Sequence, residues 1–191
     1  MPTGHEKSVR MRVIAGTARG TRLTAPRGPA IRPTLDRVRE ALFSILMPRI
    51  PGARFLDLFA GTGANGIEAL SRGAAWCTFV DNAPAAIATV THNLEAARLD
   101  THAECLRLSL PEGLGAVSPK RAPYGVVFAD PPYAFTRYGD LARLLRDMSL
   151  VEEGGLLVLE HAATTDLGEE LGGLKRFRTA HYGDTDLSFF S

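Results

Sequence analysis

The chain has 191 residues, of which 45% are hydrophobic and 23% are charged, and its formal net charge is +1. A chain of this length can bury one sizeable core, so we expect one globular, soluble domain with at most a small appendage. No apolar run reaches the roughly 18 residues that span a bilayer, and the opening segment lacks the apolar region of a signal peptide. Cys77 and Cys105 have no metal-ligand spacing. We therefore predict a cytoplasmic protein with two buried free thiols, no membrane segment and no metal.

The charges are divided unevenly along the chain. Residues 1–54 contain 11 Lys and Arg against 3 Asp and Glu, a net charge of +8, whereas residues 55–191 contain 11 against 18, a net charge of −7. A basic arm on an acidic body predicts a polyanionic partner that is contacted through the N-terminal quarter, although such a run can also be a solvated face. We expect phosphate contacts from a set of arginines in this region: Arg19, Arg22, Arg32, Arg37 and Arg39.

The N-terminal part predicts a loop-rich appendage, residues 1–33, ahead of the main domain, residues 34–191. Residues 11–23 look like short strand segments interrupted by glycines, and residues 25–34 form a Pro/Gly-rich loop. Apolar residues in 35–46 follow the 3, 4, 7 spacing of one helical face, with Thr34 as the N-cap and Pro48 closing the helix.

From residue 54 onward, strand-like and helix-like segments alternate, which predicts a mostly parallel sheet with helices on both faces. The predicted strands are residues 54–59, 76–80, 103–108, 125–129 and 156–160, and the predicted helices are 64–72, 83–98 and 138–148, with a weaker one after Pro111. The last segment predicts two further strands around a Gly183-Asp184 turn. The expected fold is therefore α/β, with seven strands and a C-terminal antiparallel hairpin.

A glycine-rich motif follows the first of these strands. Gly61, Gly63 and Gly66 have the G-x-G-x-x-G spacing, and Asp81 ends the next strand, where a carboxylate can bind ribose hydroxyls. This pattern fits a dinucleotide, but Asp57 on the preceding strand would repel a pyrophosphate. An acid at this position suits the ammonium and sulfonium charges of S-adenosylmethionine instead.

The sequence Asp-Pro-Pro-Tyr, residues 130–133, follows the fourth predicted strand. It can be a plain strand end and turn. It can also clamp a planar amine, because the side chain of Asp130 and the carbonyl of Pro131 supply two acceptors for the amine hydrogens. Tyr133 then offers a face on which an extruded base stacks.

These motifs together carry a family resemblance. "DLFAGTG", "VDN" and "DPPY" resemble motifs of Rossmann-like class I methyltransferases that act on exocyclic amines. With "MRVIAGTARGTRL", "RPTLDRVREALFSIL" and "YGDTDLSFF", the chain from Met11 to Phe190 is similar to bacterial 16S ribosomal RNA guanine-N2 methyltransferases of the RsmD type. The resemblance implies methyl transfer from S-adenosylmethionine to a guanine N2 amine, in an assembling or assembled small ribosomal subunit. We expect a monomer.

The site residues that the resemblance implies fall into two groups. The catalytic set is Asp130, Pro131 and Tyr133, and the cofactor-binding set is Asp57, Gly61, Gly63, Asp81, Asn82 and Ser109. Ser109 stands where such enzymes usually carry an acid near the adenine. Three other functions stay open from the motifs: a DNA adenine or cytosine amino-methyltransferase, a glutamine-methylating enzyme, and a non-catalytic RNA-binding module on the same fold.

Overall fold

Five parallel strands form the centre of the protein. The structure is a computed structural model, and it describes residues 11–25, 34–117 and 121–191. The five strands are β1 (Arg54–Leu58), β2 (Trp76–Asp81), β3 (Ala103–Arg107), β4 (Tyr124–Ala129) and β5 (Val151–Ala162). The order across the sheet is β3-β2-β1-β4-β5-β8-β7-β6. β4 is buried along its whole length, as a near-continuous apolar run in a doubly covered parallel sheet should be.

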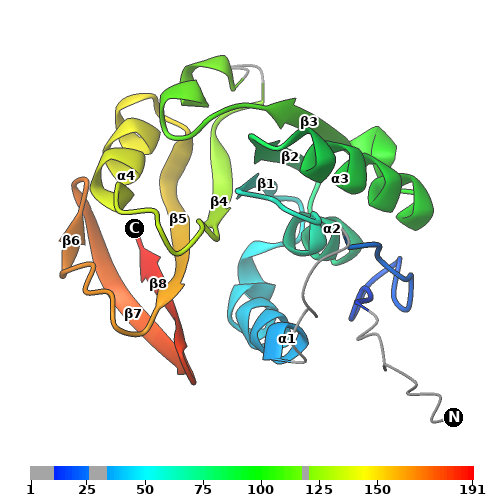
Figure 1. Ribbon diagram of the computed structural model, residues 1–191, viewed down its shortest axis with the longest axis horizontal. Coiled ribbons are helices and arrows are strands. Elements are labelled where there is room, and N and C mark those ends of the chain that lie inside the picture. Colours follow the sequence, from blue (N-terminus) through cyan, green and yellow to red (C-terminus); the bar gives the residue numbers. More distant parts are fainter. Residues whose placement is uncertain (1–10, 26–33, 118–120) are drawn as a thin grey trace, which may run out of the picture.

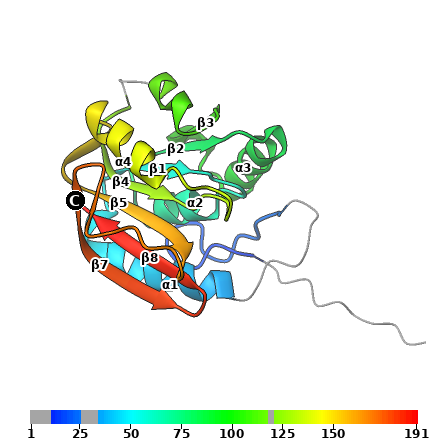
Figure 2. The same cartoon turned by 60° about the vertical axis from the view of Figure 1, so that its left-hand side comes forward.

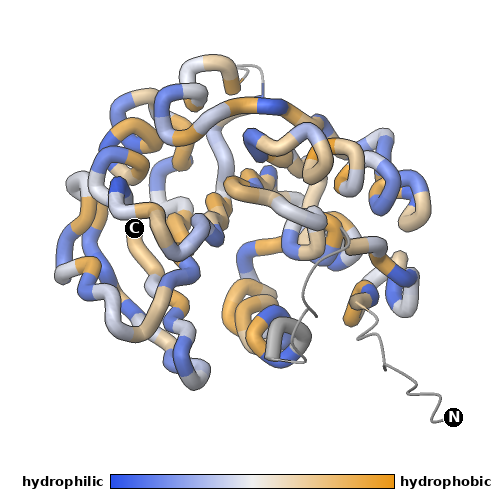
Figure 3. The backbone as a smooth tube through the Cα atoms, viewed as in Figure 1, coloured by the Kyte–Doolittle hydropathy of each residue, from blue (hydrophilic) through white to orange (hydrophobic). Residues whose placement is uncertain are grey.

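The C-terminal hairpin completes one edge of the sheet (Figure 1). β7 (Leu174–Tyr182) and β8 (Thr185–Phe190) are antiparallel and joined at Gly183-Asp184, as predicted, and β8 pairs with β5. β6 (Glu170–Leu171) makes an eighth strand that was not predicted, because two residues are too short to show a periodic pattern. Figure 3 shows β7 as mostly hydrophilic, in keeping with its place near the edge.

Helices cover both faces of the sheet, which confirms the predicted architecture (Figures 1 and 2). The helices are α1 (Thr34–Leu46), α2 (Ala64–Ser71), α3 (Pro84–Ala97) and α4 (Tyr138–Asp147), and the weak helix after Pro111 is a 3-10 turn at Glu112–Ala116. α1, α2 and α3 share one hydrophobic core and α4 belongs to another. None of the helices in the described ranges is long and apolar enough to cross a bilayer.

Side-chain alternation along the strands assigns residues to the two cores. In β4 and β5, Phe128 and Val158 pack on the α1 side, whereas Val127 and Leu157 pack on the α4 side. The same alternation places the side chains at positions 57, 130 and 160 on the α1 side. Acidic residues near the carboxyl ends of β1, β4 and β5 are therefore directed toward one helix.

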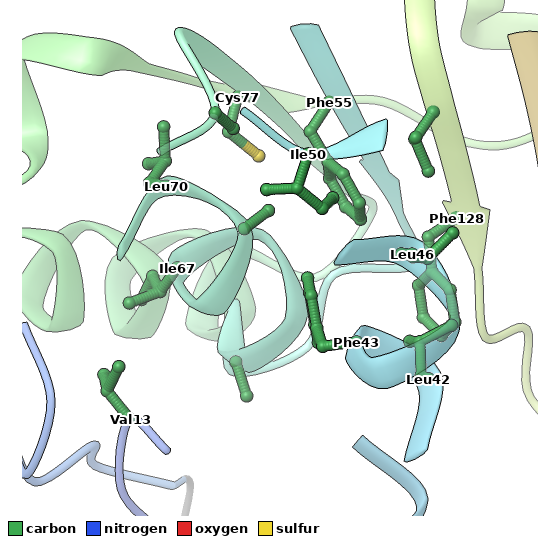
Figure 4. Packing of buried hydrophobic residues seen from close by; sticks show 14 of the residues in the cluster. Val13, Leu42, Phe43, Leu46, Ile50, Phe55, Ile67, Leu70, Cys77 and Phe128 are labelled. Atoms are coloured by element: carbon green, nitrogen blue, oxygen red, sulfur yellow. The ribbon is translucent and has the colours of Figure 1, made fainter. Parts of the chain in front are cut away.

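α1 is fixed against the sheet by large apolar contacts, several of which Figure 4 shows. Phe43 and Leu46 are fully buried, and the ring of Phe43 stacks on that of Phe55 with 6.3 Å between the centroids. Burying a side chain of this kind contributes about 1.5–3 kcal/mol. Arg39 precedes Phe43 by four residues and Leu46 by seven, so it lies on the same face of α1 and is turned inward with them.

Residues 11–25 are fastened to α2 and α3. The backbone amides of Ile14 and Ala15 donate hydrogen bonds of 2.7 and 3.0 Å to the two carboxylate oxygens of Glu68, which is fully buried. Thr24 and Asn93 exchange two further bonds, of 2.8 and 2.9 Å. The strand segments predicted here reduce to one antiparallel bridge between residues 12 and 22. The segment thereby contributes Met11 and other apolar side chains to the α1 core.

Candidate active site

The glycine loop between β1 and α2 has an unusual backbone. Phe59, Gly61 and Gly63 all have positive φ angles, of 58°, 54° and 75°. A positive φ is costly for an aromatic residue and often marks a functional site. Gly66 is required for a different reason, since a Cβ there would lie 2.2 Å from the ring of Phe79. At Gly61 the space beside the chain is open, because a Cβ there would have its nearest neighbour 3.9 Å away.

Asp57 anchors the first turn of α2. Its Oδ2 accepts a 2.9 Å hydrogen bond from the amide of Gly66. Burial raises the pKa of Asp57 from 3.8 to about 8, with smaller contributions from the charges of Asp130 and Asp81, although the Gly66 bond opposes the rise. A buried carboxyl of this kind regains its charge when a cation binds beside it, which is the property that a ligand ammonium needs.

The side chain of Asp81 accepts hydrogen bonds from two backbone amides. Its Oδ2 accepts a 2.9 Å hydrogen bond from the amide of Gly61, and its Oδ1 accepts one of the same length from the amide of Ala83. Asn82 beside it is exposed, and its carbonyl accepts a 3.3 Å bond from Nε of Arg107. Of the two predicted cofactor residues at the end of β2, Asp81 is therefore bonded to the glycine loop and Asn82 is exposed beside it.

The Asp-Pro-Pro-Tyr turn follows β4 at the same edge of the sheet. Pro131 is buried and Tyr133 is 86% exposed. The turn is closed by a 2.8 Å bond from the amide of Phe135 to the carbonyl of Pro132. The ring of Phe135 packs edge-on against Phe59, with 5.1 Å between centroids. This contact joins the turn to the glycine loop.

One cavity of about 210 Å³ lies between the two motifs and α1. Its lining includes three acidic residues, one basic residue and a rim of apolar side chains: Met11, Val38, Arg39, Leu42, Asp57, Phe59, Ala60, Gly61, Thr62, Ala64, Asn65, Phe128, Asp130 and Glu160. The fold thus brings together Asp57, Gly61 and Asp130, as the motifs predict. Gly63 is buried beneath the loop. Asp81, Asn82, Ser109, Pro131 and Tyr133 are not part of the lining.

Glu160 is a lining residue that the sequence reasoning missed. It ends the predicted strand 156–160, and Asp81 and Asp130 come directly after two other predicted strands, so this shared position is the signal that could have identified it. Burial raises the pKa of Glu160, and the charge of Asp130 adds to the effect. Asp130 keeps exposed surface, yet the protein around it excludes enough water to raise its pKa as well.

The predicted phosphate-binding arginines differ in their placement. Arg19, Arg22 and Arg37 are exposed, whereas Arg32 lies outside the described residues. Arg39 is 4% exposed, lines the cavity, and its Nη2 donates a 2.7 Å hydrogen bond to the carbonyl of Arg12. The expectation of a surface phosphate contact from Arg39 is therefore corrected. The helical period places it beside Val38 and Leu42, on the face that meets the cavity.

The chain is similar to known proteins over nearly all of its length. The family described as "Conserved hypothetical protein 95" matches residues 11–191. "Putative rRNA methyltransferase YlbH" of Bacillus subtilis strain 168 is 39% identical over 94% of this chain and 98% of its own. "Ribosomal RNA small subunit methyltransferase D" of Escherichia coli K12 is 36% identical over 82% of this chain and 77% of its own.

Solved structures agree with these sequence matches. The structure described as "Putative methyltransferase yhhF from Escherichia coli" superposes with a TM-score of 0.81 at 31% identity, covering 95% of this chain and 97% of that one. "Crystal structure of putative methylase HI0767 from Haemophilus influenzae" gives a TM-score of 0.76 at 29% identity, covering 95% and 97%. The predicted Rossmann-like methyltransferase fold is confirmed.

Proposed function

We propose that this chain, which belongs to the family described as conserved hypothetical protein 95, is an S-adenosylmethionine-dependent methyltransferase. Its substrate in this proposal is the exocyclic N2 amine of a guanine in small-subunit (16S) ribosomal RNA. The names of the two relatives support methylation of ribosomal RNA, and the name of the Escherichia coli relative supports the small subunit. One observation carries the proposal: the glycine loop and Asp130 of the Asp-Pro-Pro-Tyr turn, far apart in sequence, line the same cavity.

The residues at the glycine loop fit S-adenosylmethionine. Asp57 supplies a buried carboxyl for the ammonium group, and the open space beside Gly61 lets the ligand approach the backbone. We assign the ribose end to Asp81 and Asn82, which lie outside the cavity lining. Gly63 shapes the loop, and Ser109, which is exposed, would accept a hydrogen bond from the adenine amine. When bound, the cofactor supplies an electrophilic methyl group on a sulfonium.

The turn supplies the groups that hold the methyl acceptor. The side chain of Asp130 and the carbonyl of Pro131 accept hydrogen bonds from the two amine hydrogens, which favours a pyramidal nitrogen whose lone pair is free to accept the cofactor's methyl group. Carbon–nitrogen bond formation and carbon–sulfur bond cleavage leave the amine with one extra proton, which is released afterwards. Tyr133 projects into solvent at the turn, where it can stack on an extruded base.

The basic N-terminal segment is the RNA-binding part of this proposal. Arg19, Arg22 and Arg37 present guanidinium groups at the surface, and we assign Arg32 to the same role. A division at residue 33 separates this appendage from the methyltransferase domain. An assembling or assembled small subunit in the cytoplasm is the proposed partner, and a monomer is the proposed form of the enzyme.

Methyl transfer from labelled cofactor tests the proposal. The protein is incubated with labelled S-adenosylmethionine and, in separate reactions, unmodified small subunits, free ribosomal RNA and DNA, and the methylated nucleoside is identified by mass spectrometry. We expect N2-methylguanosine from the small-subunit reactions. N6-methyladenosine or N4-methylcytosine in DNA would instead establish the DNA amino-methyltransferase, and cofactor binding without transfer to any nucleic acid would contradict both assignments.

A further inference from the structure

Glu160 and Asp130 lie at the point where the pairing of β4 with β5 ends. Ala129 of β4 and Leu159 of β5 are the last paired residues of these two parallel strands, so residues 130 and 160 follow side by side. Neighbouring strands are about 4.8 Å apart, which sets the scale of the separation between the two backbones. On its other side Glu160 pairs with Leu187 of β8. Its backbone is therefore held from both sides.

The Glu160 side chain belongs to the cavity and has no other task in the described structure. It lines the cavity together with Asp130 and Asp57. Asp57 accepts a hydrogen bond from Gly66, but within residues 11–25, 34–117 and 121–191 no donor is hydrogen-bonded to the Glu160 carboxyl. A half-buried carboxyl beside a second one is unfavourable until a donor binds there, and burial together with the Asp130 charge raises its pKa. A hydrogen bond donated by the bound base favours the ionised carboxylate, which only accepts.

We propose that Glu160 accepts the N1–H of the target guanine and thereby makes the site specific for guanine among the bases that carry an exocyclic amine. The inference rests on the proposed function, in which Asp130 holds the N2 amine. In guanine the N2 amine stands between two ring nitrogens, of which N1–H is a hydrogen-bond donor and N3 is an acceptor. In adenine and cytosine the ring nitrogen next to the amine, N1 or N3, carries a lone pair and accepts hydrogen bonds. An acceptor placed beside Asp130 therefore matches guanine and opposes both other bases.

The arrangement also accounts for why the specificity group is a carboxyl on β5. A residue that reads N1–H must stand near the residue that holds N2, and positions 130 and 160 both come directly after the last residue pair of β4 and β5 and line the same cavity. A site built to hydrogen-bond an N–H rejects an analogue without it strongly, because the protein group is then left unpaired. Arg39, the basic residue of the lining, is instead bonded to the Arg12 carbonyl.

The test combines a change of the target base with substitutions of Glu160. Once mass spectrometry has located the methylated guanosine, small-subunit RNA is prepared with guanosine or 2-aminopurine riboside at that position. 2-Aminopurine keeps the N2 amine, but its N1 is an acceptor. Single-turnover kcat/KM is measured on both RNAs for the parent protein, Glu160→Gln, Glu160→Ala and the control Glu170→Gln, which alters an exposed residue on β6. Melting temperature and S-adenosylmethionine affinity are measured on the same samples.

We expect the parent and Glu170→Gln to prefer guanosine by about 100-fold or more. Glu160→Gln and Glu160→Ala should lower this ratio at least tenfold, the glutamine because its amide can donate to the N1 lone pair. Because 2-aminopurine also lacks O6, only the change in ratio between proteins reports on Glu160. Folded Glu160 variants that keep the parental ratio would overturn the inference, as would a loss of cofactor affinity with an unchanged ratio. A parent that transfers no methyl to guanosine would instead overturn the proposed function.

Discussion

The amide of Gly61 donates a 2.9 Å hydrogen bond to Oδ2 of Asp81, so the glycine loop is tied to the end of β2 without any ligand. The second oxygen of Asp81 accepts from Ala83 at the start of the segment that leads into α3. Asp81 is therefore a structural residue of the loop in addition to its proposed contact with the ribose.

This double role leads to a prediction that the sequence alone does not make. Asp81→Ala should weaken S-adenosylmethionine binding and also lower the melting temperature, because a part-buried amide and an exposed amide lose their acceptor, and an ordinary hydrogen bond contributes about 0.5–1.5 kcal/mol. Asp81→Asn should fall between the parent and the alanine variant, because it keeps one carbonyl acceptor. Calorimetric titration and thermal unfolding of the same samples check this, and an alanine variant with parental melting temperature would show that the two bonds contribute little.

Because the carboxyl of Asp57 is buried, we expect the stability of the folded protein to depend on pH. The pKa of this carboxyl in the folded protein is about 8, above the ordinary 3.8, so between these values the folded state holds a proton that the unfolded state has lost. The free energy of unfolding should therefore fall as the pH rises from about 4 to 8. Asp57→Asn should fall less steeply over this range, because the amide does not titrate. Urea unfolding of the ligand-free protein at pH 5, 6.5 and 8 measures the difference, and parallel slopes for the two proteins would refute it.

The exposed arginines predict a salt-dependent affinity for RNA. Each phosphate that the protein neutralises should contribute about −0.7 to −0.9 to the slope of log affinity against log salt. Arg19→Ala combined with Arg22→Ala should make the slope shallower and leave cofactor affinity unchanged. Arg39→Ala is the matched comparison, because Arg39 is buried in the cavity lining, and it should leave the slope unaltered. An unchanged slope in the double variant would mean that other residues hold the RNA.

Glu68 of α2 holds the N-terminal segment through hydrogen bonds, so its removal should loosen that segment. Its carboxylate accepts the amides of Ile14 and Ala15 and is also paired with Arg72. Glu68→Ala should therefore release residues 11–25 and make them more susceptible to limited proteolysis. Glu95→Ala, which alters an exposed residue of α3, serves as the control and should be cleaved like the parent. Equal cleavage of the Glu68 variant would show that the apolar contacts alone hold the segment.

The sequence predicts the sheet well because its signals are local and periodic. The apolar runs that became β1 and β4 and the 3, 4, 7 spacing of α1 each depend on residues close in the chain. β6 has only two residues, which pair with the start of β7, and the N-terminal segment forms only one bridge, between residues 12 and 22. Segments this short show no periodic pattern from which pairing could be predicted.

The candidate site is predictable only in part for the same reason. Asp57, Gly61 and Asp130 belong to recognisable motifs. The carboxyl ends of parallel strands necessarily meet at one edge of the sheet, so these residues can be expected to lie together. Arg39 and Glu160 carry no motif, and their roles follow from which helix face and which strand neighbour meet the cavity. An arginine in a basic run predicts a surface contact, whereas the packing of Phe43 and Leu46 turns Arg39 inward.

Tyr133 offers a way to separate stacking from hydrogen bonding at the turn. Its ring is 86% exposed, and no hydrogen bond among the described residues involves its hydroxyl. Tyr133→Ala should lower the single-turnover rate without destabilising the fold, because base stacking contributes about 1–3 kcal/mol. Tyr133→Phe should keep most of the activity, since the ring remains. Equal losses in both variants would transfer the role from the ring to the hydroxyl.

Asp130 is the residue on which the proposed chemistry depends most. The decisive measurement is the single-turnover rate of methyl transfer to small-subunit RNA by Asp130→Ala, with melting temperature and S-adenosylmethionine affinity determined on the same preparation. Removing one preorganised polar contact at a reacting group costs about 10²–10³ in rate, so we predict a loss of that size with parental cofactor affinity and a folded protein. A well-folded Asp130→Ala enzyme that binds the cofactor and transfers the methyl group at near the parental rate would contradict the clamp.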